Sequence, residues 1–299
     1  MSDTKPDANS EFKADTPPVR VIEPDPTQIY TPLETEDEQA LVEAVRLLEY
    51  TSLAARLSHV LGKQLTSATS LLPEKIRSMA SKAASMALRS AMKMALRSLD
   101  QKPGASNTIY HKTMAVASGA AGGALGIAAL PVELPVSTTI ILRAIADIAR
   151  SEGEDLKDPA TAIACMEVFA LGGKSQVDEE IDSSYFAARA FLAKSVTDAT
   201  KFIASQGAAS ESAPVIVKLI SQIAARFGVV VSQKVAAQAV PVLGAIAGAS
   251  VNYAFVDHFQ GLARGHFTVR RLERKYGADH IHLEYGRLAQ IWRDNRDGA

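Results

Sequence analysis

Apolar residues recur at the three- and four-residue spacing of helices along most of the chain from Thr35 onward. Thr35 and Glu38 have the spacing of a capping box, and the segment that they open carries Leu41, Val45, Leu48, Leu53 and Leu57. Prolines and glycines divide the rest into predicted helices from Pro73 to about Leu99, Asn107 to Ala129, Ser137 to near Gly153, Pro159 to Gly172, Asp178 to Gln206, Pro214 to Phe227, and Gly244 to Tyr276.

The sequence carries no comparable signal for strands. Val229–Val231 is a β-branched triplet, but no alternating apolar pattern is joined to a hairpin signal. Aromatic residues make up 6% of the chain against 47% for all apolar types, so the helices are expected to pack largely through small side chains. The predicted fold is all-α, a multi-helix bundle.

Charge divides the chain into an acidic beginning and a basic body. Residues 1–38 hold ten acidic and three basic side chains, a net charge of −7, although the whole chain has −1. Six of the 13 prolines lie in the same stretch, which has too few apolar residues to offset the entropy of ordering it. We therefore expect a disordered tail over residues 1–34, a helical domain over 35–292 and a flexible C-terminus over 293–299.

Several function classes find no support in the sequence. The balanced total charge argues against general nucleic-acid binding, and the single Cys165 excludes a disulfide framework or a thiolate metal cluster. His280 and His282 lie near Glu284, but in an expected loop, so no metal site is predicted and no cofactor is expected. The first 20 residues hold no apolar run, which favours a cytoplasmic protein.

A basic stretch is the first candidate for function. Between Arg56 and Arg97 there are eight cations and one acid, Glu74. At 100° per residue, five of the cations fall within an arc of about 80°: Lys75, Lys82, Arg89, Lys93 and Arg97. Such a helix suits an anionic membrane surface or an acidic protein partner. The alternatives are a solvated outer face of the bundle and a face masked by the acidic tail.

Two apolar segments with regularly spaced small residues are the second candidate. Met114–Val132 has 19 residues and Val235–Val256 has 22, and neither contains a charge. The glycines that would let helices approach closely are Gly119, Gly122, Gly123, Gly126, Gly244 and Gly248. Prolines in and beside these segments favour tightly packed helices inside the protein. Two apolar hairpins in an integral membrane protein remain the alternative.

Three ionisable residues near those segments form a candidate catalytic site. Glu133 lies between two prolines, and Asp257 and His258 follow the second apolar segment. If the fold brought them together, their altered pKa values would suit an atypical, hydrolase-like enzyme. The simpler interpretation is that Glu133 caps the helix expected to begin at Ser137 or stabilises its dipole.

Several stretches resemble the EcsC protein family over roughly residues 50–285. They are Ala129–Pro135, Ile140–Asp147, Gly153–Leu156, Val240–Ala245, Asn252, Phe255 and His266–Gly277. The resemblance implies a bacterial helical domain that works near the cytoplasmic membrane, and it assigns no catalytic residue. Together with the basic stretch, it favours a non-enzymatic, cytoplasmic protein on the inner face of that membrane over the enzyme and the integral membrane protein.

Overall fold

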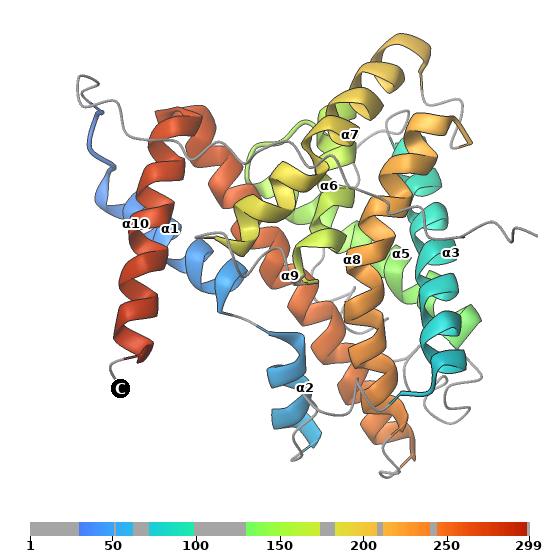
Figure 1. The fold of residues 1–299 in the computed structure, drawn as a ribbon. Coiled ribbons are helices and arrows are strands. Elements are labelled where there is room, and N and C mark those ends of the chain that lie inside the picture. Colours follow the sequence, from blue (N-terminus) through green and yellow to red (C-terminus); the bar gives the residue numbers. More distant parts are fainter. Residues whose placement is uncertain are drawn as a thin grey trace, which may run out of the picture.

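The structure is a computed structural model, which describes residues 30–50, 52–61, 72–98, 130–173, 183–207, 212–239 and 244–297. Within these ranges it holds nine helices and no strand, which confirms the all-α prediction (Figure 1). The helices are α1 (Thr35–Glu49), α2 (Leu53–Leu61), α3 (Glu74–Ser98), α5 (Leu130–Ser151), α6 (Pro159–Leu171), α7 (Ser184–Gln206), α8 (Pro214–Ala239), α9 (Gly244–Tyr276) and α10 (Ala278–Asp297).

Helices α6 and α9 organise the core. Eleven of the 13 residues of α6 are buried, so this helix is covered on every side. The 33-residue α9 packs against α1, α2, α5, α6, α8 and α10. Figure 1 shows α9 crossing the molecule between α3, at one edge, and the pair α1 and α10, at the other. Residues on α9 can therefore meet partners from almost every part of the fold.

Local signals correctly placed several helix ends. Asp158 accepts a hydrogen bond of 2.9 Å from the backbone N–H of Ala160, and Pro159 occupies the first turn of α6. Helix α9 runs between the predicted limits, and Gly277 after it has a φ of 94°, which a glycine adopts without strain. At α1 the prediction of a capping box is wrong, because Glu34 is the N-cap residue and no side chain caps the helix.

Three other predicted boundaries are wrong because burial outweighs local propensity. Helix α5 begins at Leu130 rather than Ser137 and includes Pro135, because Leu130 and Leu134 are fully buried and one proline removes one helical hydrogen bond. Helix α8 passes through the β-branched triplet to Ala239, since Val230 and Val231 are fully buried. The stretch expected to be a loop around His280 is the start of α10.

Some expectations fall on parts of the chain that the structure leaves undescribed. They are the tail over residues 1–29, the helix from Asn107 to Ala129, and the glycines Gly119, Gly122, Gly123 and Gly126. The division into a domain ending at 292 and a flexible C-terminus remains a prediction, with the described part of α10 reaching Asp297.

Candidate functional site

Helix α3 presents a row of exposed cations. Lys75, Lys82, Arg89 and Lys93 are all exposed, whereas the side chain of Arg97 lies outside the described residues. The opposite face is buried against α5 and α8 and is built mainly of small residues: Ala80, Ala83, Ala84, Ala87, Leu88, Ala91 and Met92. The short alanine side chains hold α3 close to its neighbours, so the charged face must point outward.

Helix α3 itself carries little negative charge. The single acid in α3 is Glu74, which forms an ion pair with Arg77. Met86 is 56% exposed and lies four residues after Lys82 and three before Arg89, within the same stripe. We call Lys75, Lys82, Met86, Arg89 and Lys93 the α3 stripe.

Glu133 belongs to a buried ion pair. Lys234 of α8, which is fully buried, donates a hydrogen bond of 2.8 Å to Glu133 Oε1, and Gln238 Nε2 lies 3.2 Å from Glu133 Oε2. The Lys234 ammonium also lies 4.7 Å from the centre of the Phe255 ring. Burial lowers the pKa of Lys234, and the nearby carboxylate opposes that shift. Glu133 thus joins α5 to α8, and the prediction that it caps a helix at Ser137 is wrong.

Asp257 and His258 have neighbours of their own. Asp257 forms an ion pair with Arg56 of α2. Neither ring nitrogen of His258 has a hydrogen-bond partner in the described part of the chain, and burial lowers its pKa to about 3, so the ring is neutral at physiological pH. No hydrogen bond is found among Glu133, Asp257 and His258, and the catalytic role of these three stays a prediction.

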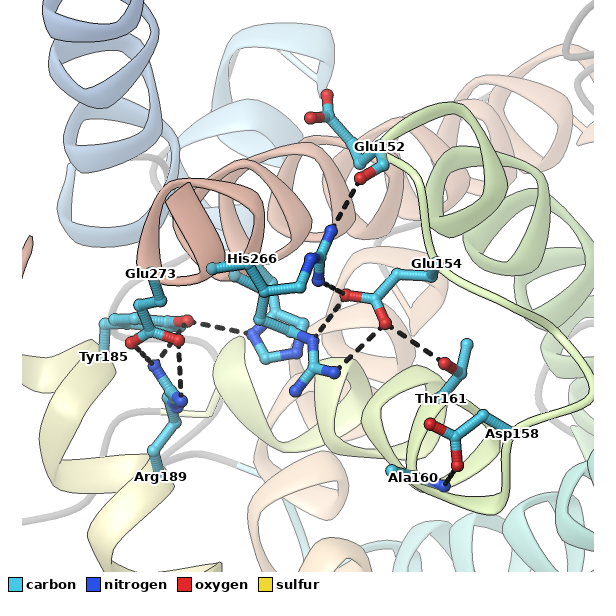
Figure 2. A network of polar contacts seen from close by, with 11 residues as sticks. Glu152, Glu154, Asp158, Ala160, Thr161, Tyr185, Arg189, His266 and Glu273 are labelled. Carbon is cyan, nitrogen blue, oxygen red and sulfur yellow. Dashed lines mark hydrogen bonds and ion pairs between the residues drawn. The ribbon is translucent and has the colours of Figure 1, made fainter. Parts of the chain in front are cut away.

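The C-terminal half of α9 carries an ion-pair network that the sequence analysis missed (Figure 2). Arg270 binds Glu154 through two hydrogen bonds of 2.8 and 3.1 Å, and Arg274 pairs with the same carboxylate. Burial raises the pKa of Glu154, but the bonds to these two guanidiniums outweigh burial and leave its pKa below the usual value. Thr161 adds a hydroxyl donor at 3.1 Å. The turn between α5 and α6 is thereby fixed to α9.

The same half of α9 also binds α7. Arg189 of α7 forms two hydrogen bonds to Glu273, of 2.6 and 3.2 Å, and donates one of 3.3 Å to the Tyr185 hydroxyl. That hydroxyl lies 3.0 Å from His266 Nδ1, as Figure 2 shows. Burial beside Arg189 and Arg270 lowers the pKa of His266 well below its usual value, so the ring is neutral.

Helix α1 is joined to α9 in its first turn, and to α7 and α10 at its last residue. Asp37 accepts hydrogen bonds from Arg271, Lys275 and Tyr276, each between 2.8 and 2.9 Å, and these contacts lower its pKa to about 2. At the other end of α1, Glu49 accepts hydrogen bonds from the backbone and hydroxyl groups that begin α7, and from the Tyr285 hydroxyl. A carboxylate at a helix N-terminus is favoured by the exposed N–H groups there.

Close helix packing occurs at glycines that the sequence analysis did not select. A Cβ on Gly173 would lie 2.2 Å from the backbone oxygen of Arg226, and one on Gly265 would lie 2.7 Å from Leu48 Cγ. Gly244 and Gly248 lie in the first turns of α9, and their packing remains a prediction.

One helix of the described part, Pro214–Gln238, is long and apolar enough to cross a membrane, but 56% of its most apolar window is buried inside the protein, as in many core helices.

His280 and His282, the two histidines near Glu284, stack on aromatic rings. His280 stacks on Tyr30 at 4.5 Å between ring centres, and His282 stacks on Phe186 at 3.9 Å. Among the residues that the structure describes, no group of three His, Cys, Asp or Glu side chains is arranged to hold a metal ion.

Comparison with protein families gives one result. A model described as "EcsC protein family" matches residues 35–272, which include α1 to α8, most of α9 and the part of the ion-pair network that precedes Glu273. Neither the curated proteins nor the solved structures yielded a match to the chain.

Proposed function

The chain belongs to the EcsC protein family, and we propose that it is a non-enzymatic helical protein that binds the inner, anionic surface of the cytoplasmic membrane through the α3 stripe. One observation carries the proposal. The four described cations of the stripe are exposed along one face, and the opposite face of α3 is already used by the core. The basic face is thus exposed to solvent, and contact with a partner there would leave the packing of the core unchanged.

The shape of the stripe favours a membrane over a small acidic protein. From Lys75 to Lys93 the helix rises by about 27 Å, and α3 lies at an edge of the molecule (Figure 1). A flat anionic surface can contact all the cations of the stripe at once. Each cation contributes about 1 kcal/mol near anionic lipid, so the binding is the sum of several weak and salt-sensitive terms. The exposed Met86 adds an apolar contact among the charges.

The non-enzymatic part of the proposal rests on the candidate catalytic residues. Glu133 and Asp257 are each engaged by a cation, Lys234 and Arg56 respectively. His258 is neutral, buried and hydrogen-bonded to neither carboxylate. A general base must accept a proton from the substrate, and neither the two paired carboxylates nor the buried His258 ring is well suited to do so.

Co-sedimentation with vesicles tests the proposal. We expect the full-length protein to bind vesicles of phosphatidylcholine and phosphatidylglycerol at low salt, and not vesicles of phosphatidylcholine alone. The triple variant K75E/K82E/R89E should bind on the order of a hundredfold more weakly, because it loses three contributions of about 1 kcal/mol.

A matched control is available outside α3. The variant K157E/K194E/K201E reverses the same number of exposed charges, and two of them lie on α7 with the same seven-residue spacing as in the stripe. Asp198 lies between them, so this face of α7 is not uniformly basic. The control should keep most of the binding. Equal losses in the two variants, no binding by the wild type, or capture of an acidic protein without any affinity for the vesicles would each contradict the proposal.

A further inference from the structure

The first turns of α5 leave apolar side chains in water. Val132 is 73% exposed and Val136, one helical turn later, is 46% exposed. Pro131, which precedes them, is exposed as well. We call these three residues the α5 patch. Eight large apolar side chains are exposed in the described part of the chain, and Val132 has the largest exposed fraction of them. The core therefore makes little use of this patch.

A buried ion pair fixes the direction in which the α5 patch points. Glu133, the residue after Val132, accepts the hydrogen bond of 2.8 Å from Lys234 of α8, and Leu134 is fully buried. With these side chains turned into the core, the helical period places the α5 patch outside. A rotation of α5 that buried the patch would separate Glu133 from Lys234. The exposure of the patch is thus a consequence of how the core is packed.

The α5 patch belongs to a helix that packs directly against α3. Figure 1 shows α3 and α5 side by side at one edge of the molecule. The axes of packed helices lie about 8–10 Å apart, similar to the depth of about 5–10 Å to which an amphipathic helix enters a bilayer surface. Between Leu130 and Arg143 the single acid of α5 is the buried Glu133, so this outer face presents no negative charge to an anionic surface.

We propose that the α5 patch and Met86 enter the boundary between headgroups and acyl chains when the α3 stripe binds the membrane. This role rests on the proposed membrane binding and deepens it. An anionic bilayer is the occupant that suits both features, because it offers negative charge for the stripe and apolar depth for the patch. The attraction of the stripe is weakened by salt, whereas the burial of apolar area does not depend on charge. Attachment through both is firmer than through cations alone.

Tryptophan reporters in the full-length protein test this inference. Trp292 is the single tryptophan of the chain, so Trp292→Phe gives a background for one new tryptophan. On vesicles of phosphatidylcholine and phosphatidylglycerol, the emission of Val132→Trp and of Val136→Trp should shift to shorter wavelength. Brominated acyl chains in the same vesicles should quench it severalfold. The control Phe191→Trp, at a position that is 44% exposed on α7, should show neither change.

The strength of binding gives a second measurement. The variant V132S/V136S should bind the same vesicles about tenfold more weakly, because the partial burial of two valines is lost. Its affinity should fall with salt concentration as steeply as that of the wild type, whereas the triple charge-reversal variant of the stripe should show a shallower dependence. Phe191→Ser removes an exposed apolar side chain from α7 and should bind like the wild type.

Co-sedimentation of each sample distinguishes this inference from the membrane proposal on which it rests. Vesicles that hold the protein while both reporters keep their emission would overturn the inference and leave the membrane proposal standing. The absence of binding by the wild type would overturn both. A shift of emission that appears without vesicles and grows with protein concentration would assign the α5 patch to a contact between two copies of the chain, and would overturn the inference as well.

Discussion

Two helices of this protein carry dense groups of cations, and the fold uses them in opposite ways. On α3, Lys75, Lys82, Arg89 and Lys93 are exposed along the edge of the molecule. On α9, Arg270, Arg271, Arg274 and Lys275 bind the carboxylates of Glu154, Glu152 and Asp37. The comparison shows that a basic helix in a sequence can present its cations as an exposed row or bind them to carboxylates of neighbouring elements.

The position of each helix in the bundle explains the difference. Helix α3 lies at an edge of the molecule, so its alanine-rich face packs into the core and its cations remain exposed to solvent. The C-terminal half of α9 lies beside carboxylates of α1 and of the turn between α5 and α6. Arg270, whose side chain is 24% exposed, loses part of its hydration there and is stabilised by its hydrogen bonds to Glu154, whereas Arg274 and Lys275 are paired but remain 45% and 44% exposed. Removal of a cation is therefore expected to be almost neutral for folding on α3 and costly on α9.

The largest effect is expected at the most deeply buried cation, Lys234. Glu133→Ala would leave its ammonium without a counter-charge, and the free energy of unfolding should fall by about 3–5 kcal/mol. Urea denaturation followed by circular dichroism measures this change. The double variant E133L/K234M replaces the pair with apolar groups and should recover most of the loss. A double variant as unstable as the single one would show that the pair itself is worth more than an apolar contact.

The next effect compares α9 with α3 directly. Arg270→Ala removes two hydrogen bonds to Glu154 and should lower the free energy of unfolding by about 2–3 kcal/mol, whereas Arg89→Ala should change it by about 0.5 kcal/mol or less. Both are arginine-to-alanine changes within long helices, so differences in helix propensity cancel. Similar losses at the two positions would mean that the α3 stripe also has a structural role.

The smallest effect concerns the clamp between α9 and α1. Hydrogen bonds from Lys275 and Arg271 lower the pKa of Asp37 from 3.8 to about 2, so the stabilisation is fully present above pH 4 and is lost as the pH falls toward 2. Because both cations are partly exposed to solvent, we expect Asp37→Asn to cost about 1 kcal/mol at neutral pH. The gap in unfolding free energy between wild type and variant should narrow below pH 4. If the difference in unfolding free energy stayed constant down to pH 3, the destabilisation by Asp37→Asn would come from packing and not from charge.

Much of the fold could be predicted because the relevant forces act between residues close in sequence. The apolar period, the Asp158-Pro159 start of α6 and the Gly277 end of α9 depend on contacts within one or two turns. The outward arc of cations on α3 follows from the same period. Predictions were wrong where distant burial outweighed these local preferences, as at Pro135 in α5 and the valine triplet of α8.

Little of the buried polar network could be predicted, because its partners are far apart in the chain. Arg270 and Glu154 are separated by 116 residues, and Lys234 and Glu133 by 101. Glu133 could be singled out from its place between two prolines, but nothing near it in the sequence indicates Lys234.

The sequence by itself determined that this chain forms helices, where most of them begin or end, and which face of α3 is basic, since each depends on a short-range period. The tertiary structure decided which charges stay in water and which become paired, because the hydration of a charge depends on everything packed around it. That decision separates the exposed stripe of α3 from the paired cations of α9.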